Sequence, residues 1–224
     1  MRQFLQKLPL PAEFLLVVLG AFGLLITASL LQMFRPIAPA AISDEGLWSV
    51  IRYEVTVLAV LATFLHLRGW TVERIGIRIT LRDTLIGLAF VLVAELIGMG
   101  ALALIAPISP RLATMIENAG NASGTLGIPS VLTFSIVNPI FEETFVCGYI
   151  IAALRGRSEP WTAINMSVAI RLLYHLYQGP AALIGIVPFG LILACWYARS
   201  GRLWPAITAH AAANLLDLGR FVSW

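Results

Sequence analysis

Seven stretches of mostly apolar residues run along the chain, separated by polar or glycine- and proline-containing connections. A hydrocarbon layer of ~30 Å needs ~20 apolar residues per helix, and backbone polar groups in lipid must be satisfied within that helix. The pattern therefore predicts an all-α, polytopic transmembrane helix bundle of about seven spans, with about six to eight as the range. The stretches are approximately Glu13–Phe34, Leu47–Leu67, Thr84–Ala106, Ser130–Ala153, Trp161–Tyr177, Ala181–Ala198 and Leu203–Leu216.

Two of the connections are long. Arg68–Asp83 carries a charge every few residues, which is typical of a segment at the membrane interface. Pro107–Gly127 is rich in proline, asparagine and glycine, and this composition predicts a loop. Neither connection is long enough to separate folding units, and the chain shows no internal repeat. We therefore expect one membrane domain over residues 1–224.

The composition agrees with a protein that spans a membrane. Hydrophobic residues make up 59% of the chain and charged residues 12%, whereas a soluble domain carries about 25% charged residues. The net charge of +3 is dispersed, so no nucleic-acid partner is expected. Cys147 and Cys195 both lie in apolar stretches, which indicates neither a disulfide framework nor a paired-cysteine metal site.

The basic residues indicate an orientation. Ten of the 15 fall on one side of a seven-span bundle, and the positive-inside rule then places the N-terminus in the cytoplasm and the C-terminus outside. Fourteen of the 15 are arginine, a bias typical of high-GC bacteria, so we expect the bacterial inner (plasma) membrane. The ten are Arg2, Lys7, Arg68, Arg74, Arg78, Arg82, Arg155, Arg157, Arg199 and Arg202.

Ionisable and amide side chains interrupt the apolar stretches. A charge at mid-bilayer costs at least ~2.5 kcal/mol, so each is a functional hypothesis by default. Arg52 and Glu54 are the exception, because they lie near a predicted helix end and are expected to extend to the interface. The remaining residues are Glu95, Glu142, Glu143, Arg171, His175, His210 and Asn214, and all but the first follow residue 140.

Polar residues recur four positions apart in three of the later stretches, which places each pair on one helix face. In lipid such faces turn toward one another, so we expect one pocket that contains water. Pro139 removes a backbone donor and loosens the helix just before the two glutamates. The pairs are Asn138 with Glu142, Arg171 with His175, and His210 with Asn214.

The adjacent pair Glu142 and Glu143 suggests acid–base chemistry. Two carboxylates in a low dielectric cannot both ionise cheaply, so one is expected to hold a proton beside the other. Histidine can share the proton transfers, and asparagine and histidine donors can stabilise an oxyanion. These groups suffice to activate water against a peptide carbonyl without a serine or cysteine nucleophile.

The motifs resemble those of the CPBP intramembrane protease family, which includes the CAAX-processing endopeptidases and the bacteriocin-processing proteins (the Abi family). That family carries E-E-x-x-x-R followed by Gly-Tyr, then F-x-x-x-H, then H-x-x-x-N. The resemblance covers roughly residues 71–216 and is sharp from Pro139 onward, with a catalytic core at about 130–217. The corresponding segments are Glu142-Glu143-Thr-Phe-Val-Cys147-Gly148-Tyr149, Arg171-Leu-Leu-Tyr-His175 and His210-Ala-Ala-Ala-Asn214.

The resemblance implies an endopeptidase that hydrolyses a membrane-associated peptide or protein. Glu142 would activate the water, assisted by His175. His210 and Asn214 would form the oxyanion hole, and Glu143 would orient the site. The family is described as metal-independent, so no cofactor is expected. Prenylated CAAX substrates would approach from the cytoplasm, whereas the seven-span topology puts His175 and Asn214 nearer the outer side, so the substrate class stays open.

Two residues depart from the family pattern. Cys147 stands where the motif has arginine, and Arg171 stands where it has phenylalanine. We hypothesise that Arg171 replaces the missing cation and pairs with Glu143 across the helix interface. Cys147 is expected to be a small packing residue, because a thiolate is disfavoured in an apolar site. Asn138 is expected to support the site from the face it shares with Glu142.

Two other functions are consistent with the sequence. A zinc-dependent membrane protease would use Glu142, His175 and His210 as ligands, although no H-E-x-x-H helix is present. A catalytically inactive CPBP-like scaffold or immunity protein would account for the departures at Cys147 and Arg171. Sensitivity to a chelator identifies the first, and full biological function of a Glu142→Gln variant identifies the second. Glu95 is expected to be structural, to line the cavity or to pair with a base such as Arg171.

Overall fold

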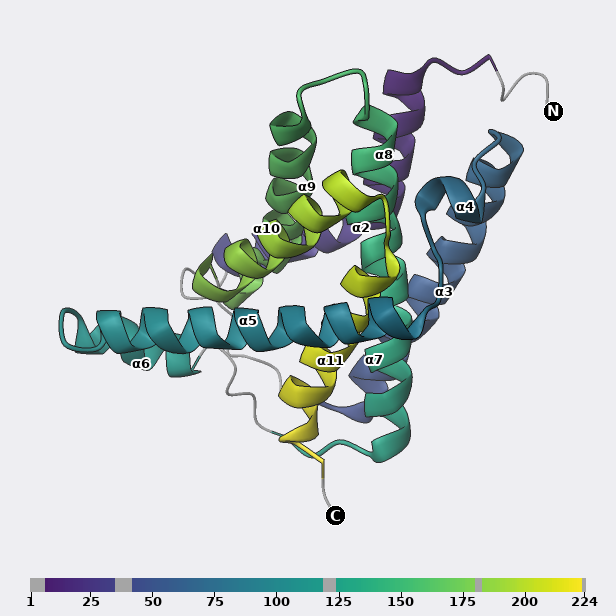
Figure 1. Cartoon of the computed structure of the whole chain (residues 1–224). Coiled ribbons are helices and arrows are strands. Elements are labelled where there is room, and N and C mark those ends of the chain that lie inside the picture. Colours follow the sequence, from purple (N-terminus) through teal and green to yellow (C-terminus); the bar gives the residue numbers. More distant parts are fainter. Residues whose placement is uncertain (1–6, 35–41, 119–123, 180–182, 223–224) are drawn as a thin grey trace.

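The computed structural model describes residues 7–34, 42–118, 124–179 and 183–222. Across these ranges every regular element is a helix (Figure 1). The shorter elements are α4 (Val72–Ile75), α6 (Pro110–Asn118), the π-helix η1 (Thr144–Tyr149), α8 (Ile150–Leu154) and the 3₁₀-helix η2 (Leu176–Gln178). The long helices are α2 (Leu10–Phe34), α3 (Asp44–Leu67), α5 (Leu81–Ile105), α7 (Ile128–Glu143), α9 (Pro160–His175), α10 (Leu183–Ser200) and α11 (Trp204–Gly219).

The predicted all-α membrane bundle is confirmed. Within the described ranges, five helical segments are long and apolar enough to cross a membrane: α2, α3, α5, α10 and the continuous segment Ile128–Leu154. Helices α9 and α11 have 16 residues each and reach only ~24 Å at ~1.5 Å per residue. The count of about seven spans therefore stays a prediction. Ala181, where the sixth apolar stretch is predicted to begin, lies outside the described residues.

The segment Ile128–Leu154 forms the centre of the bundle. Of its most apolar 18-residue window, 78% is buried, against 22% or less in the other four spans. The segment runs through α7, η1 and α8, with Pro139 inside α7. The π-helical turn begins directly after Glu143, and such turns often mark functional sites. Both glutamates thus lie between a proline and a local change in helix geometry.

Local sequence explains where several helices begin. The side chains of Ser43 and Thr80 accept hydrogen bonds from the backbone N–H groups of Gly46 and Asp83, which caps α3 and α5. A proline in the first turn begins α7, α9 and α11. Proline suits this position because its φ is already helical and its missing N–H has no partner there. These signals place the three helices that carry the polar motifs.

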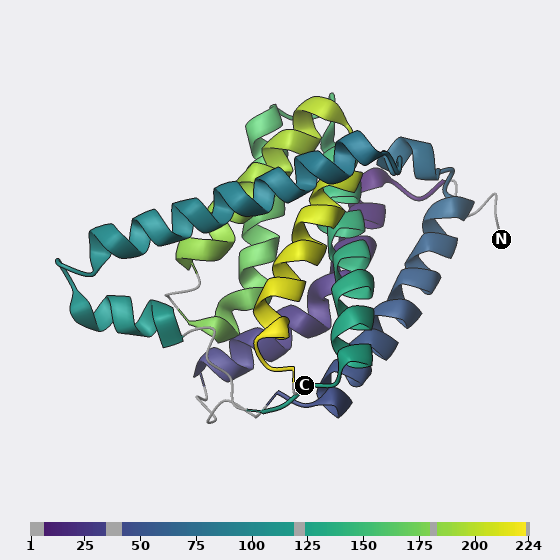
Figure 2. The ribbon, with the colours of Figure 1, turned by 60° about the horizontal axis from the view of Figure 1, so that its bottom comes forward.

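Helix α5 crosses α10 and α11 instead of running beside them. Figures 1 and 2 show α5 lying over these two helices, with its far end and α6 extending beyond the bundle. Gly87 permits the close approach to α11. A Cβ atom at this position would lie 1.9 Å from the Thr208 hydroxyl oxygen and 2.6 Å from the carbonyl oxygen of Pro205.

Helix α6 corrects one prediction. The composition of Pro107–Gly127 predicts a loop, but Pro110–Asn118 is helical. That prediction is wrong because Pro110 occupies the first helical position, where proline starts a helix and does not interrupt it. Residues 119–123 of the same segment lie outside the described residues.

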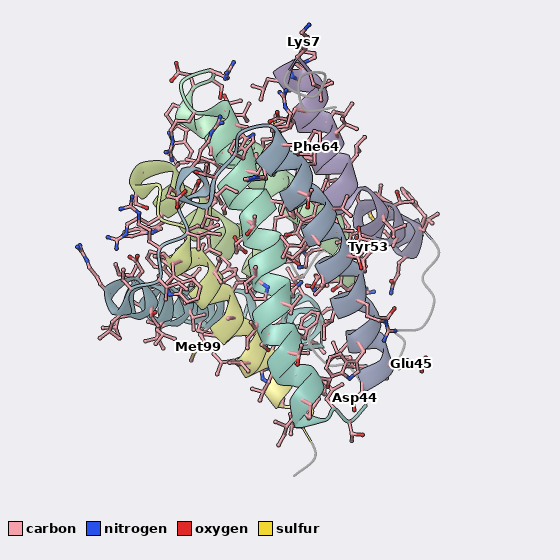
Figure 3. All side chains as sticks on the ribbon, turned by 90° about the vertical axis from the view of Figure 1, so that its right-hand side faces the viewer. Lys7, Asp44, Glu45, Tyr53, Phe64 and Met99 are labelled. Carbon is pink, nitrogen blue, oxygen red and sulfur yellow. The ribbon has the colours of Figure 1, made fainter. Side chains whose placement is uncertain are left out.

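Basic residues gather at one end of the molecule, called here the basic end. The N-terminal end of α2 and the connections that precede α5, α9 and α11 meet there, and Arg202 pairs with Asp83 at 2.7 Å. Figure 3 shows Lys7 at this end and Asp44 at the opposite end. Arg2 lies outside the described residues. The others are Lys7, Arg68, Arg74, Arg78, Arg82, Arg155, Arg157, Arg199 and Arg202.

Candidate active site

The polar faces of α7, α9 and α11 meet in the interior. Glu143 is fully buried, and its carboxylate contacts both neighbouring helices. Nη2 of Arg171 in α9 lies 2.7 Å from Oε1 and 2.6 Å from Oε2 of Glu143. Nδ1 of His210 in α11 lies 2.7 Å from Oε1 of the same residue. Glu143 therefore joins the two helices through charge-assisted hydrogen bonds.

Arg171 also approaches the second carboxylate. Its Nη1 lies 3.7 Å from Oε2 of Glu142, so one guanidinium serves both acids. The sequence predicts that one of the two carboxyl groups holds a proton, and the structure adds a cation 3.7 Å from Glu142 and 2.6 Å from Glu143. Gly190 in α10 makes room for this side chain, since a Cβ there would lie 3.2 Å from Cδ of Arg171.

The contact across the helix interface that the sequence predicts, between Arg171 and Glu143, is present. Arg171, and not an arginine at position 147, contacts Glu143. Cys147 is buried in η1, with its sulfur 3.9 Å from the hydroxyl oxygen of Ser167. This environment agrees with a packing residue, as the sequence predicts.

Glu142 accepts hydrogen bonds at both oxygens. The hydroxyl of Tyr174 donates to Oε2 at 2.6 Å, and Nδ2 of Asn138 donates to Oε1 at 2.9 Å. Glu142 is 5% exposed, so it is buried but keeps a small solvent-accessible surface. Tyr174 is missing from the predicted site. Its position three residues after Arg171 places it near the same face of α9, but helix spacing does not show that it contacts Glu142.

His210 and the two glutamates form a compact group. One carboxylate oxygen from each of Glu142 and Glu143 and one ring nitrogen of His210 all lie within 4.8 Å of one another. A water molecule that bridges two polar atoms spans about this distance, at ~2.8 Å from each. Since Nδ1 of His210 bonds Glu143, the other ring nitrogen, Nε2, is the one left for a substrate or water.

His175 lies at the end of α9, outside this group. Its Nδ1 is 2.9 Å from the backbone oxygen of Arg171. A carbonyl only accepts, so Nδ1 carries a proton and Nε2 is an acceptor in the neutral ring. The imidazole packs against Tyr174, with ring centroids 4.5 Å apart. It is half-buried and near enough to Glu142 for their charges to interact.

A chain of side-chain amides connects Asn214 to the acids. Nδ2 of Asn214 donates to Oδ1 of Asn138 at 2.9 Å, and Asn138 in turn donates to Glu142 and, at 2.7 Å, to Glu54. Six of the eight predicted site residues are thus joined to one another through side-chain hydrogen bonds or ion pairs. The two exceptions are His175 and Cys147.

Glu54 corrects another prediction. The sequence places it near a helix end at the interface, but it lies inside α3 and is 1% exposed. The interfacial prediction is wrong because α3 begins at Asp44, three residues before the predicted start at Leu47, and because Asn138 of α7 supplies a buried partner for the carboxyl group. The presence of a glutamate within an apolar stretch was the sequence feature that could have identified Glu54 as a buried, functional candidate.

Glu95 does not join the site. It is exposed on α5, while the ion pairs of Arg171 across the described ranges go to Glu142 and Glu143. Glu95 therefore neither pairs with Arg171 nor belongs to the acid–histidine group.

The donor set is a poor fit for zinc. The predicted ligands are Glu142, His175 and His210, but the atoms that converge belong to Glu142, Glu143 and His210. Both oxygens of Glu143 bond Arg171, and one also bonds His210. A divalent cation there would displace these bonds and lie beside a guanidinium, which stays charged at all working pH values.

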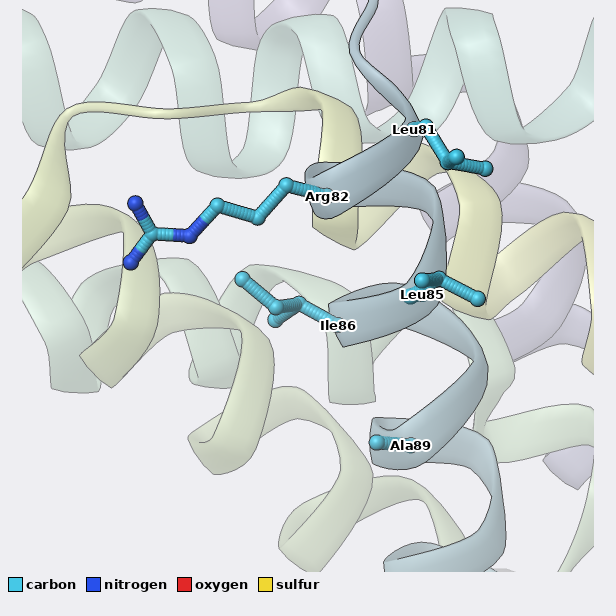
Figure 4. A pocket seen from close by; sticks show the side chains of 5 residues that line it. All are labelled: Leu81, Arg82, Leu85, Ile86 and Ala89. Atoms are coloured by element: carbon cyan, nitrogen blue, oxygen red, sulfur yellow. The ribbon is translucent and has the colours of Figure 1, made fainter.

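A shallow groove of about 590 Å³ lies elsewhere, on the first turns of α5. Figure 4 shows its lining, which consists of Arg82 and four apolar residues: Leu81, Leu85, Ile86 and Ala89. It contains neither an acid nor an imidazole, so it lacks the side chains that the sequence predicts for a hydrolytic site.

Comparison with known proteins agrees with this location. No curated protein and no solved structure matches the chain. One family does match, described as type II CAAX prenyl endopeptidase Rce1-like, and the match covers residues 124–216. The matched segment contains α7 and α9 and ends within α11, the three helices whose polar faces meet in the interior. Residues 124–216 are therefore similar to the Rce1-like family of CAAX-type membrane endopeptidases, in agreement with the CPBP resemblance of the three motifs.

Proposed function

We propose that the chain is an intramembrane endopeptidase that uses Glu142 to activate water. The observation that carries the proposal is the convergence of Glu142, Glu143 and His210 within 4.8 Å, with Asn214 joined to the same hydrogen-bond chain. A carboxylate, an imidazole and an amide donor around one buried point are the parts needed for general-base hydrolysis of a peptide bond.

The proposed reaction has two steps. Glu142 takes a proton from water as the water oxygen attacks the scissile carbonyl carbon, and the carbonyl π electrons move to oxygen. The second N–H of Asn214 donates to that oxyanion, and so does His210 Nε2 when its ring carries both protons. The oxyanion then collapses, the C–N bond breaks, and the proton held by Glu142 passes to the leaving amine, assisted by His175.

Glu143 and Arg171 are proposed to position these groups. Glu143 is fully buried and accepts three hydrogen bonds from Arg171 and His210. Glu142 accepts two and is 5% exposed, so Glu142 is the acid with an acceptor site left for water. The bond of Glu143 to Nδ1 sets the direction of the His210 ring, and Arg171 fixes Glu143. Tyr174 restrains Glu142 from the opposite side.

The proposed substrate is a membrane-associated peptide or protein, and the family description makes a prenylated C-terminal CAAX peptide the first class to test. His175 and Asn214 both lie in the halves of α9 and α11 that are farther from the basic end. With the basic end in the cytoplasm, as proposed from the positive-inside rule, the substrate would reach these two residues from the opposite half of the membrane.

Cleavage by the purified protein tests the proposal. The wild type and Glu142→Gln are incubated in detergent with a farnesylated CAAX peptide and with a peptide library, and products are identified by mass spectrometry. We expect wild-type cleavage and a loss of about a hundred-fold or more in the variant, as removal of a general base costs ~10²–10⁴-fold. Equal cleavage by both proteins would refute the role of Glu142.

The same assay distinguishes the zinc alternative. Because Arg171 occupies the position between the two carboxylates, a chelator is expected to leave the cleavage rate unchanged. Loss of activity on chelation, with recovery on addition of zinc, would contradict this expectation and support a metalloprotease.

A further inference from the structure

A fourth helix contributes an acid to the site. Glu54 lies in α3, and its neighbour Tyr53 stands midway along that helix in Figure 3. Oε1 of Glu54 accepts a hydrogen bond from Nδ2 of Asn138 at 2.7 Å, and the same nitrogen donates to Oε1 of Glu142 at 2.9 Å. One amide group therefore connects Glu54 to the proposed general base.

The hydrogen bonds around Asn138 set the orientation of its amide. The two N–H groups go to Glu54 and Glu142, and the oxygen accepts from Asn214. An amide rotated by 180° would direct its oxygen toward two carboxyl groups and its amino group toward another donor. An acceptor at Glu54 favours the observed orientation, which serves both Glu142 and Asn214.

The surroundings of Glu54 favour an uncharged side chain. It is 1% exposed, and no cation pairs with it in the part of the chain that the structure describes. Glu142 is the acidic group that faces it, and Oε2 of Glu54 is buried without a hydrogen-bond partner among these residues. An isolated carboxylate in such a place is costly, whereas a neutral carboxylic acid presents the same carbonyl oxygen to Asn138.

We propose that Glu54 is a neutral positioning residue, whose carbonyl oxygen holds Asn138 in the orientation that donates to Glu142 and accepts from Asn214. The inference rests on the proposed function, because its effect is on Glu142 and Asn214 as catalytic groups. Glu54 itself touches neither water nor substrate in this account.

Two substitutions separate positioning from charge. Glu54→Gln keeps a carbonyl oxygen for Asn138, so we expect kcat within about two-fold of the wild type. Glu54→Leu leaves an N–H of Asn138 without an acceptor, so kcat should fall about ten- to a hundred-fold with little change in KM. The probe is a farnesylated CAAX peptide, cleaved by purified protein in detergent.

Glu95 provides the matched control, because it is an exposed glutamate inside another apolar helix. Glu95→Gln and Glu95→Leu should both retain the wild-type rate. Elution from a sizing column and thermal unfolding in detergent show whether each variant is folded.

Infrared spectroscopy tests the neutral state without any substrate. The wild type at neutral pH should show a carbonyl stretching band of a protonated carboxyl group that Glu54→Gln lacks. This measurement decides the protonation state even where Glu54→Leu fails to fold.

The outcomes are distinct. A rate for Glu54→Gln as low as that of Glu54→Leu, a wild-type rate for Glu54→Leu, or an infrared band unchanged by Glu54→Gln would each overturn the inference. Glu142→Gln is measured alongside. An inactive Glu142→Gln with a fully active Glu54→Leu refutes the role of Glu54 alone, whereas a fully active Glu142→Gln refutes the proposed function itself.

Discussion

At the scale of single residues, the site depends on one guanidinium. Arg171 is 2% exposed and bonds Glu143 at 2.6 Å while it lies 3.7 Å from Glu142. A buried ion pair adds little net stability, but removal of one partner leaves an uncompensated charge that costs ~3–5 kcal/mol. We therefore predict that the departure from the family pattern at position 147 is tolerated only while position 171 carries the cation.

Arg171→Phe, the residue found in the family motif, tests this dependence. The substitution should lower the free energy of unfolding by ~3–5 kcal/mol, since it strips the buried Glu143 of its cation. Cleavage activity should fall with it. The measurements are thermal unfolding in detergent and the rate of peptide cleavage.

The double variant Arg171→Phe with Cys147→Arg restores the family motif. It should recover stability and activity relative to Arg171→Phe, because Cys147 lies one turn after Glu143 on the same helix segment. Arg171→Lys is the matched control. It keeps the charge but lacks the planar fork that bonds carboxylates bidentately, so we expect an intermediate result. Failure of the double variant to recover would contradict the exchange of cations.

At the scale of helices, the sequence predicts which residues share a face but not which helices become neighbours. Spacing of four correctly groups His210 with Asn214 on α11, and all seven apolar stretches correspond to helices. Tyr174 and Glu54 could not be placed in the site this way. Tyr174 contacts Glu142 because α9 packs against α7, and Glu54 contacts Asn138 because α3 packs against α7. The periodicity of a single helix does not show which helices pack together.

The crossing of α5 over α11 is a second feature that periodicity does not give. It depends on Gly87, where the added methyl group of alanine would meet the backbone of Pro205 and the side chain of Thr208. Gly87→Ala should destabilise the protein by ~1–3 kcal/mol, the usual cost of overpacking. It should also lower activity, since α11 carries His210 and Asn214.

Gly98 lies in the same helix and supplies the control for this prediction. No atom lies within 4 Å of a Cβ built there, so Gly98→Ala should leave the unfolding temperature unchanged or raise it slightly, as alanine favours a helix. An equal effect of the two substitutions on thermal unfolding would show that Gly87 acts through helix propensity and not through the contact with α11.

At the scale of the whole molecule, charge and chemistry lie in different places. Nine of the 13 described basic residues lie at the basic end, whereas Glu142, Glu143 and His210 lie inside, around the middle of the central segment Ile128–Leu154. This separation agrees with a protein oriented by its basic end, with the reaction site enclosed in the membrane.

Labelling of introduced cysteines tests that orientation. Arg157 is exposed at the basic end, and Arg220 is exposed after α11 at the other. In intact bacterial cells, a membrane-impermeant maleimide should label Arg220→Cys and should label Arg157→Cys only after lysis. The native protein is the control for Cys147 and Cys195. Labelling of Arg157→Cys in intact cells would contradict the proposed topology.

The central claim is that groups from α7 and α11 act as one catalytic unit. Cleavage rates of Glu142→Gln, Asn214→Ala and the double variant on the same peptide test it most directly. Residues that act as a unit show strongly non-additive losses, so we expect the double variant to be about as slow as Glu142→Gln alone. A double loss equal to the product of the two single losses, or wild-type cleavage by Glu142→Gln, would contradict the account.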